Sequence, residues 1–301
     1  MKVFLTGATG FVGKGILAKL CEEGHHTVCL VRPGSERKRQ QTQAEKGEIT
    51  YVNGDLFDQS SLLKAMNGCE AVIHLVGIIR EQPGKGITFS RIHTEGTKNV
   101  VEAAKQAGIR RFVHMSALGA RENATSAYHR TKFEAEKLVQ ASGIPFVIFR
   151  PSVIFGPGDE FVNMLADLVK MPVTPVLGNG SYPLQPVARD TVADVFVQAL
   201  SNPAAANQTY ETGGPEPITY GQILDRIGTA LGKRHVRKIH IPIALMKPVI
   251  TAMEGFPFFP ITHTQLTMLL EGNACQDGDQ LYRIFDTQKI DFLQGISTYL
   301  R

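Results

Sequence analysis

The sequence predicts an α/β fold, a doubly wound parallel sheet of about seven strands with a small, mostly helical C-terminal domain. Three observations predict this fold. A glycine-rich turn joins the first apolar segment to the first helical one, short apolar segments then alternate with amphipathic helical segments up to residue 212, and the chain changes character after residue 215. With 301 residues, the chain has room for one large domain or two modest ones.

The glycine-rich turn follows an apolar, β-prone segment at residues 2–5, and the apolar residues after the turn recur at helical spacing. Gly7 permits a tight turn, Gly10 lets the backbone approach a pyrophosphate, and Gly13 lets the helix pack closely on the strand. A merely structural turn is the alternative, which the flanking strand and helix disfavour. The N–H groups at the helix start would face the phosphates of a dinucleotide. The expected cofactor-binding residues here are Gly7, Thr9, Gly10, Phe11, Val12 and Gly13.

The second predicted strand, residues 27–31, ends at Arg32. Folds of this kind that bind NAD place Asp or Glu near this position to accept hydrogen bonds from the adenosine ribose. Arginine cannot accept those bonds but can pair with a 2′-phosphate through two of its N–H groups, and Arg37, Lys38 and Arg39 follow closely. The sequence therefore predicts a preference for NADP(H), with NAD(H) as the alternative cofactor. A solvated basic turn is the other interpretation.

The third and fourth strands, predicted at residues 49–52 and 71–75, end beside further candidates. The side chain of Asp55 is expected either to accept a bond from the adenine amino group or to cap a helix. His74 alternates with apolar neighbours and is expected to be packed rather than catalytic. The expected cofactor-binding residues at these two strand ends are Asp55, Leu56, Val76 and Gly77.

Tyr128 and Lys132 are four residues apart in a predicted helix that runs to about Gln140, so they share one face. Ser116 ends the fifth predicted strand, residues 112–116, twelve residues before the tyrosine. Ligands of such sheets bind outside the carboxyl ends of the strands, where these three side chains can converge. We expect the ammonium of Lys132 to lower the tyrosine pKa from its usual value of about 10, which suits proton transfer. A purely structural role is the alternative.

Composition and charge exclude several classes of function. The net charge of +4 implies neither a nucleic-acid partner nor a strongly acidic one. The four cysteines show no C-x-x-C spacing, so reduced thiols in a cytoplasmic protein are expected and a metal site is not. The first strand starts at residue 2, which argues against a signal peptide, and no apolar run is long enough to cross a bilayer.

Residues 239–270 are unusually apolar, although prolines, Lys247 and Glu254 interrupt them. One interpretation is the core of a small domain. The other is an apolar lid, a substrate pocket or a membrane-surface patch, helped by the basic cluster at residues 233–238, which is otherwise a solvated face. We expect some of these apolar side chains to line a pocket near Tyr128.

With these residues in hand, the chain resembles the extended or atypical branch of the short-chain dehydrogenase/reductase superfamily, which includes proteins similar to epimerases and dehydratases. The resemblance covers residues 1 to about 215 and includes the glycine turn, Gly54-Asp55-Leu56, Ser116, Tyr128 with Lys132, and Arg150-Pro151 leading to Gly156-Pro157-Gly158. Within that branch the chain is most similar to bacterial relatives of the NADPH-binding accessory subunit of respiratory complex I. Val31-Arg32-Pro33 and the apolar region 239–270 carry this finer likeness.

The resemblance implies a Rossmann domain of residues 1–155 with about 186–214, and a small substrate or lid domain of about 156–185 with 215–301. It implies that Tyr128 is the acid/base, that Lys132 binds the ribose hydroxyls and that Ser116 binds the substrate. Pro151 and Val153 would lie near the carboxamide of the cofactor. Ala117-Leu118-Gly119 follows Ser116 where sugar-nucleotide dehydratases carry Thr-Asp-Glu, and His93 stands where many relatives have Asn.

Three functions are compatible with these residues. The first is an NADP(H)-dependent oxidoreductase acting on a small or apolar carbonyl compound, such as a quinone-like or isoprenoid-like one. The second is a non-catalytic NADPH-binding assembly or structural factor, and the third is a sugar-nucleotide epimerase, which the absent clamps for a nucleotide diphosphate after Gly158 disfavour. Expected partners are an apolar small molecule and, as an open alternative, a membrane surface or a respiratory complex. The expected location is the cytoplasm, and the sequence leaves the oligomeric state open.

Overall fold

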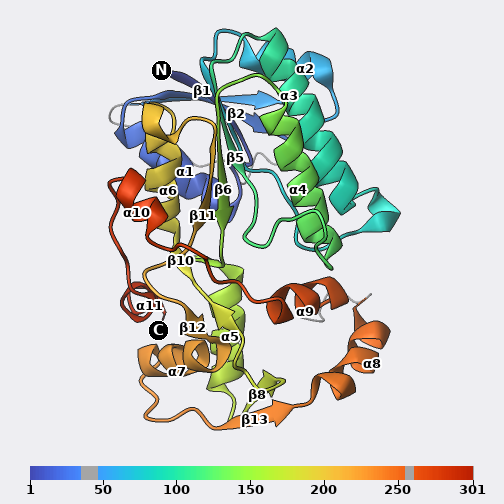
Figure 1. Ribbon diagram of the computed structural model, residues 1–301, viewed down its shortest axis with the longest axis vertical. Coiled ribbons are helices and arrows are strands. Elements are labelled where there is room, and N and C mark those ends of the chain that lie inside the picture. Colours follow the sequence, from blue (N-terminus) through green and yellow to red (C-terminus); the bar gives the residue numbers. More distant parts are fainter. Residues whose placement is uncertain (35–46, 255–260, 301) are drawn as a thin grey trace.

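The computed structural model describes residues 1–34, 47–254 and 261–300, and its central element is a seven-stranded parallel sheet (Figure 1). The strand order is β11-β6-β5-β4-β1-β2-β3, which reverses between β1 and β4 as in nucleotide-binding folds. The predicted fold class is therefore confirmed. The strands are β1 (Lys2–Thr6), β2 (His26–Val31), β3 (Glu48–Asn53), β4 (Ala71–His74), β5 (Arg111–Met115), β6 (Phe146–Pro151) and β11 (Gln208–Thr212).

Helices cover both faces of this sheet (Figure 1). One face is covered by α1 (Phe11–Glu22), α6 (Arg189–Gln198) and α10 (Gln280–Ile284), and the other by α2 (Gln59–Met66), α3 (Gly96–Gln106) and α4 (Ala127–Gln140). Apolar side chains such as Leu17 and Phe196 fill the first interface, and Met66 and Val100 fill the second. Because both faces are buried, the strands are almost continuously apolar.

The start of α3 is irregular. A π-helical turn, Ser90–Glu95, precedes it, and a short 3₁₀ helix, Pro83–Lys85, lies in the loop after β4. The π turn is wider than an α turn and often occurs at functional positions. Here it carries His93, whose side chain is buried beside α4.

A small lobe lies beyond the carboxyl ends of β6 and β11 (Figure 1). Its core contains Val162, Leu165, Ile223, Ile227 and Phe292. Parallel β8 and β13 form one two-stranded sheet, antiparallel β9 and β12 form another, and β7 pairs with β10 at the junction with the large sheet. The elements are β7 (Ile154–Phe155), α5 (Glu160–Lys170), β8 (Thr174–Leu177), β9 (Pro183–Leu184), β10 (Val187–Ala188), β12 (Ile218–Thr219), α7 (Tyr220–Ala230), β13 (Lys238–Ile241), α8 (Ile243–Met253), α9 (His263–Leu270) and α11 (Phe292–Ile296).

The apolar residues of the range 239–270 are not the core of this lobe. Among the described residues of that range only Ile250, Thr262 and Leu266 are buried, whereas Ile239 and Leu245 are 56% and 64% exposed. The interpretation of this region as packed core is therefore wrong for β13 and α8. Within the described ranges, no helix has the length and apolar character that a membrane crossing requires.

Candidate active site

The glycine turn lies between β1 and α1 and has the geometry of an anion-binding site. Gly7 has a φ of 79°, in the left-handed region that favours glycine, and its carbonyl accepts a hydrogen bond from the Gly10 N–H at 3.0 Å. A Cβ on Gly13 would lie 2.0 Å from the Gly7 oxygen, so no side chain fits there. Gly10 caps α1 without a side-chain bond and no acidic residue occupies the first turn. The exposed helix start therefore fits a diphosphate group.

Arg189, from the start of α6, lies beside this turn. Its guanidinium carbon is 5.5 Å from the centre of the Phe11 ring, and a Cβ on Gly15 would meet its side chain at 3.1 Å. One of its Nη atoms donates to the Pro157 carbonyl at 3.3 Å. The sequence offered no signal for this contact because α6 and the turn are far apart in the chain. Arg189 adds positive charge near the expected phosphates.

The predicted adenosine-binding residues follow the ends of β2 and β3. Arg32 is exposed directly after β2, whereas Arg37, Lys38 and Arg39 lie outside the described residues. Asp55 accepts a hydrogen bond from the Phe57 N–H at 2.9 Å. The side chain that caps α2 is Asp58, so the alternative that Asp55 caps this helix is wrong.

The other predicted cofactor residues lie along the carboxyl edge of the sheet. Leu56 is buried under α3 and its carbonyl accepts a bond from Asn99 at 3.0 Å, so its side chain has a packing role. Val76 is half-buried against the same core, and Gly77 is exposed. Pro151 ends β6, and the half-buried Val153 follows two residues later.

Lys132 is buried at the carboxyl end of β5. Its side chain is 3% exposed and its ammonium donates to the Met115 carbonyl at 3.0 Å. A Cβ on Gly77 would lie 2.9 Å from Lys132 Nζ, so the glycine leaves room for the lysine head. Burial lowers the pKa of Lys132 to about 8, against the opposing effect of the Glu136 carboxylate. Ser116, the residue after Met115, is buried, and its hydroxyl has no hydrogen-bond partner among the described residues.

Tyr128 lies one helical turn before Lys132 on α4 and is half-buried. Its ring packs edge-on against the rings of His93, at 5.3 Å between centres, and Phe89, at 5.7 Å. Burial raises the pKa of Tyr128 to about 12. The expectation that the neighbouring ammonium lowers this pKa is therefore not met, because burial dominates. The phenol is protonated near neutral pH and is a proton donor.

His93 is a neutral wall of this site. Its Nε2 lies 3.1 Å from the Ile78 N–H and its Nδ1 lies 2.9 Å from the Thr131 hydroxyl, which in turn donates to the Ala127 carbonyl. Nε2 also lies 3.1 Å from the Ile78 carbonyl oxygen, so it faces a donor and an acceptor of the same residue. Burial, with a contribution from Lys132, lowers the pKa of His93 to about 2. His93 therefore fixes the Tyr128 ring without carrying charge.

Two further histidines lie under the site in the sheet. His74 bonds to the hydroxyls of Thr6 at 2.7 Å and Thr97 at 3.1 Å, so the prediction that it is packed is confirmed. His114 stacks on it at 5.5 Å between ring centres, and neither ring nitrogen of His114 has a partner among the described residues. Burial lowers the pKa of both histidines, that of His74 to about 3. Both rings are neutral packing groups.

A buried ion pair supports Lys132 from the next turn of α4. Glu136 is fully buried and forms two bonds with Arg150 of β6, at 2.8 Å to Nε and 2.6 Å to Nη2. Pairing of this kind compensates for the cost of burying the carboxylate. Sequence reasoning singled out Arg150 only as part of its motif and missed Glu136. The acidic residue four positions after Lys132 was the available signal.

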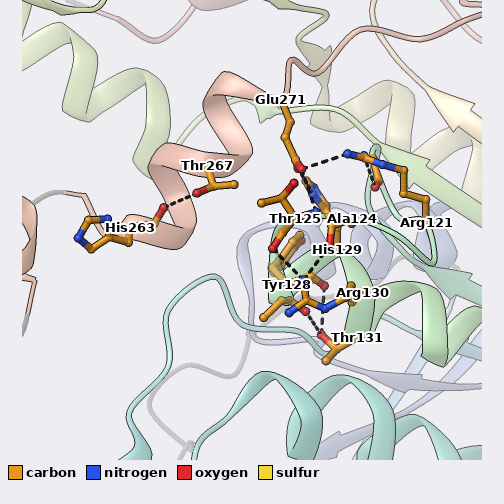
Figure 2. Close-up of polar contacts among 12 residues, drawn as sticks. Arg121, Ala124, Thr125, Tyr128, His129, Arg130, Thr131, His263, Thr267 and Glu271 are labelled. Atoms are coloured by element: carbon orange, nitrogen blue, oxygen red, sulfur yellow. Dashed lines mark hydrogen bonds and ion pairs between the residues drawn. The ribbon is translucent and has the colours of Figure 1, made fainter. Parts of the chain in front are cut away.

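The small lobe is joined to the start of α4 by one carboxylate, which Figure 2 shows. Glu271, directly after α9, bonds through Oε2 to His129 Nδ1 at 2.9 Å. Its Oε1 accepts from Arg121 at 3.0 Å and from the Thr125 N–H at 3.2 Å. His129 is the neighbour of Tyr128, so this contact brings α9 to the proposed proton donor. Sequence reasoning missed it because nothing local pairs residues this far apart.

A second contact joins the two parts of the molecule. The Arg80 side chain, in the loop after β4, donates to the carbonyl of Glu254 at the end of α8. The Glu254 carboxylate accepts from the His263 N–H at the start of α9, at 3.0 Å. The helices α8 and α9 are therefore tied to the loop after β4 and to the start of α4. The described residues contain no group of three or more metal-ligating side chains.

A family model described as NAD(P)H-binding matches residues 7–203, which include the glycine turn and Ser116, Tyr128 and Lys132. The chain belongs to the NAD(P)H-binding family. The matched range begins in the turn after β1 and ends shortly after α6.

Two relatives of this NAD(P)H-binding protein are informative. The 40 kDa subunit of mitochondrial NADH-ubiquinone oxidoreductase from Neurospora crassa is 25% identical over 286 residues, 95% of this chain and 71% of that protein. Ceramide reductase from Caulobacter vibrioides is 35% identical over 180 residues, 60% of this chain and 55% of that protein. The chain thus spans only part of each relative's length. The predicted resemblance to an accessory subunit of complex I is confirmed.

Among solved structures, the fold is similar to that of the NADPH-dependent quinone oxidoreductase QOR2 from Escherichia coli, complexed with NADPH. The TM-score is 0.74 with 19% identity, over 98% of each chain. At this identity the likeness concerns the fold alone.

Proposed function

We propose that the protein is an NADP(H)-dependent reductase of a small or apolar carbonyl compound. The observation that carries the proposal is the arrangement at the end of β5. There the buried Lys132 ammonium bonds to the Met115 carbonyl, the protonated Tyr128 phenol lies one turn away, and the Ser116 hydroxyl lacks a partner. A proton donor, a cation and an unused hydroxyl at the carboxyl edge of such a sheet suit carbonyl reduction.

The glycine turn and the start of α1 would hold the diphosphate of the cofactor, and Lys132 would hold its ribose hydroxyls. The bound cofactor supplies hydride to the carbonyl carbon. Tyr128 donates its phenolic proton to the carbonyl oxygen, and Ser116 donates a hydrogen bond that orients this oxygen. The raised pKa of Tyr128 keeps the phenol protonated before the reaction. Lys132, with its pKa lowered to about 8, is the adjacent group that can return a proton to the tyrosinate.

Arg32 supports the preference for NADP(H). It is exposed directly after β2, the position where an acidic residue would bind an unphosphorylated ribose. Its guanidinium suits a 2′-phosphate, which accepts two parallel hydrogen bonds.

The apolar character of the proposed substrate is supported by the segment joined to α4. Glu271 brings the end of α9 beside Tyr128, and Leu270 and Ile79 are 38% and 49% exposed near the two tethers of this segment. One relative is named a ceramide reductase, which supports an apolar carbonyl or the corresponding alcohol as ligand class. We place the protein in the cytoplasm, at a membrane surface or beside a respiratory complex.

Tyr128→Phe tests the proposal. Turnover is measured as NADPH oxidation with a panel that contains a benzoquinone and a long-chain ketone. We expect turnover to fall by about 10²–10⁴, the usual contribution of a general acid, while the Kd for NADPH stays within about twofold. Tyr282→Phe, a tyrosine whose hydroxyl bonds to the Gly213 carbonyl, is the control. Unchanged turnover in Tyr128→Phe on a reduced substrate contradicts the assignment.

A second candidate function is an NADPH-binding structural or assembly factor. The observation that favours it is the likeness over 95% of the chain to a subunit of NADH-ubiquinone oxidoreductase. In that case NADPH would raise the melting temperature, as any ligand specific for the folded state does, without being oxidised by the panel. A sugar-nucleotide epimerase is distinguished by incubating the protein and NAD⁺ with a UDP-hexose and separating the epimers, because epimerisation causes no net oxidation or reduction of the cofactor.

A further inference from the structure

The two-stranded sheet of β8 and β13 presents an apolar face to solvent. Its parallel register pairs Ile239 with Pro175 and Ile241 with Leu177. Because successive side chains of a strand point to opposite faces, the fully buried Val176 marks the inner face. The two pairs therefore share the outer face, where Ile239 is 56% exposed. A half-exposed sheet normally carries polar residues on this face.

Exposed apolar side chains also occur on the segments that adjoin this sheet in the chain. Leu245 and Val249, one turn apart on α8, are 64% and 43% exposed, and Met171 and Val173, before β8, are 47% and 43% exposed. With Ile239, these residues form what we call the apolar edge. It contains five of the nine exposed large apolar side chains of the described residues, so the exposure is concentrated rather than scattered. Figure 1 shows β8 and β13 at the end of the molecule farthest from the central sheet, with α8 beside them.

The charge around the apolar edge is predominantly positive, although Asp167 and Asp225 stand directly before the segments that build it. The segments that build it, residues 168–189 and 226–253, contain no aspartate or glutamate. Arg234, Arg237 and Lys247 are exposed. Arg237 stands two residues before Ile239, so the alternation of side chains along a strand places both on the same face. The basic cluster is only partly a solvated face, because Lys238 pairs with Asp225 at 2.6 Å and Lys233 bonds to the Val169 carbonyl. The remaining cations are available to an anionic surface.

We propose that the apolar edge docks the protein on an anionic lipid bilayer, with Leu245 and Val249 at the level of the acyl boundary and Arg234, Arg237 and Lys247 on the headgroups. The inference rests on the proposed location at a membrane surface and assigns the face responsible. Apolar side chains surrounded by cations are the composition of interfacial segments. A second copy fits less well, because a symmetric contact would bring the exposed Arg234, Arg237 and Lys247 of the two copies together.

The experiment is flotation of the full chain with two kinds of vesicle, pure phosphatidylcholine and phosphatidylcholine with 30 mol% phosphatidylglycerol, a content of about a third chosen to give a strongly negative surface. We expect binding to the anionic vesicles only, weakened by salt. Leu245→Glu/Val249→Glu and Arg234→Glu/Arg237→Glu should each lower the partition coefficient by at least about tenfold. Met164→Glu and Lys98→Glu, an exposed apolar and an exposed basic residue elsewhere, are the matched controls.

Retained NADPH binding by each variant establishes that it is folded. The proposal is overturned if the wild type does not bind the anionic vesicles. It is also overturned if both double variants bind them as strongly as the wild type does. A dimer that the Leu245→Glu/Val249→Glu change dissociates identifies a second copy as the occupant and also overturns it. The result is independent of the reductase proposal, because Tyr128→Phe leaves the apolar edge intact and must bind vesicles as the wild type does.

Discussion

The floor of the site around Lys132 and the helices α8 and α9 are held in different ways. In the floor, Lys132, His93 and Glu136 are almost wholly buried, and each has a bonded partner. Among the described residues, those of α8 are mostly exposed and those of α9 mostly half-buried, and the two helices are tied to the large sheet's loops by Glu271 and by the bond from Arg80 to the Glu254 carbonyl. The floor is therefore sensitive to volume and burial, whereas the two helices are sensitive to the loss of single polar contacts.

The largest effect is expected in the glycine turn, which belongs to the tightly packed part. Gly13→Ala places a methyl group 2.0 Å from the Gly7 carbonyl oxygen, a backbone atom that cannot move aside cheaply. We expect NADPH binding to weaken by more than about 100-fold and the free energy of unfolding to fall by about 3 kcal/mol. Calorimetric titration and chemical denaturation measure the two quantities.

The control for this change is Gly84→Ala. A Cβ on Gly84 meets nothing within 4 Å, so both quantities should stay close to the wild-type values. NADPH binding that survives Gly13→Ala would mean that the helix start does not approach the cofactor as closely as proposed.

The same contrast explains how far the sequence could predict the structure. The glycine spacing and the apolar alternation are local signals, so the seven parallel strands, the turn and the relation of Tyr128 to Lys132 could be predicted. The exposure of β13 and α8 could not, because apolar composition does not distinguish a core from an interface. Glu271 and His129 form a pair by tertiary packing, which leaves no spacing in the chain to detect. The spacing of Glu136 from Lys132 was detectable, but its pairing with Arg150 was not, because Arg150 belongs to another element.

The pH dependence of stability tests the burial of Lys132. Its pKa falls from about 10.5 in the unfolded chain to about 8 in the folded protein, so folding disfavours the charged form. Between these pH values the unfolded state binds more protons than the folded state, so the free energy of unfolding rises with pH. The total rise is up to about 3 kcal/mol. Below pH 8 the titration of Lys132 leaves the free energy of unfolding unchanged.

Lys132→Met should be more stable than the wild type at pH 7 and should not show this rise with pH. Urea denaturation at pH 7–10.5 measures the free energy of unfolding of both proteins, and the difference between them should shrink as the pH rises. Lys98→Met, an exposed lysine of α3, should follow the wild type at each pH. Parallel curves for Lys132→Met and the wild type would contradict a buried charge at this position.

An effect of intermediate size is expected on the choice between NADPH and NADH when Arg32 is replaced. Arg32→Asp replaces a guanidinium that suits a 2′-phosphate with a carboxylate that repels it and suits free ribose hydroxyls. Since hydrogen bonds to charged groups contribute about 1.5–3 kcal/mol, the ratio of the Kd values for NADPH and NADH should shift by about 10- to 100-fold. Arg110→Asp, before the amino end of β5, should leave the ratio unchanged. Wild-type protein that binds NADH as tightly as NADPH contradicts the assignment.

The smallest effect is expected at Glu271, in the loosely tied part. Its side chain is 14% exposed and accepts bonds from Arg121 and the Thr125 N–H while pairing with His129. Glu271→Gln keeps the size and one acceptor oxygen but loses the charge, so a loss of about 1 kcal/mol is expected.

Because the contact fixes α9 beside Tyr128, that loss should appear as an increase of up to about tenfold in KM for the carbonyl substrate, with the Kd for NADPH unchanged. Amide exchange across residues 263–270 should accelerate in the same variant, a readout that separates a loosened tether from a damaged cofactor site. Glu122→Gln is the matched control, since this carboxylate is 73% exposed and 3.7 Å from Lys137. If Glu271→Gln changes neither KM nor exchange, α9 is held by its packing, and the contrast between the floor and the two helices is one of exposure alone.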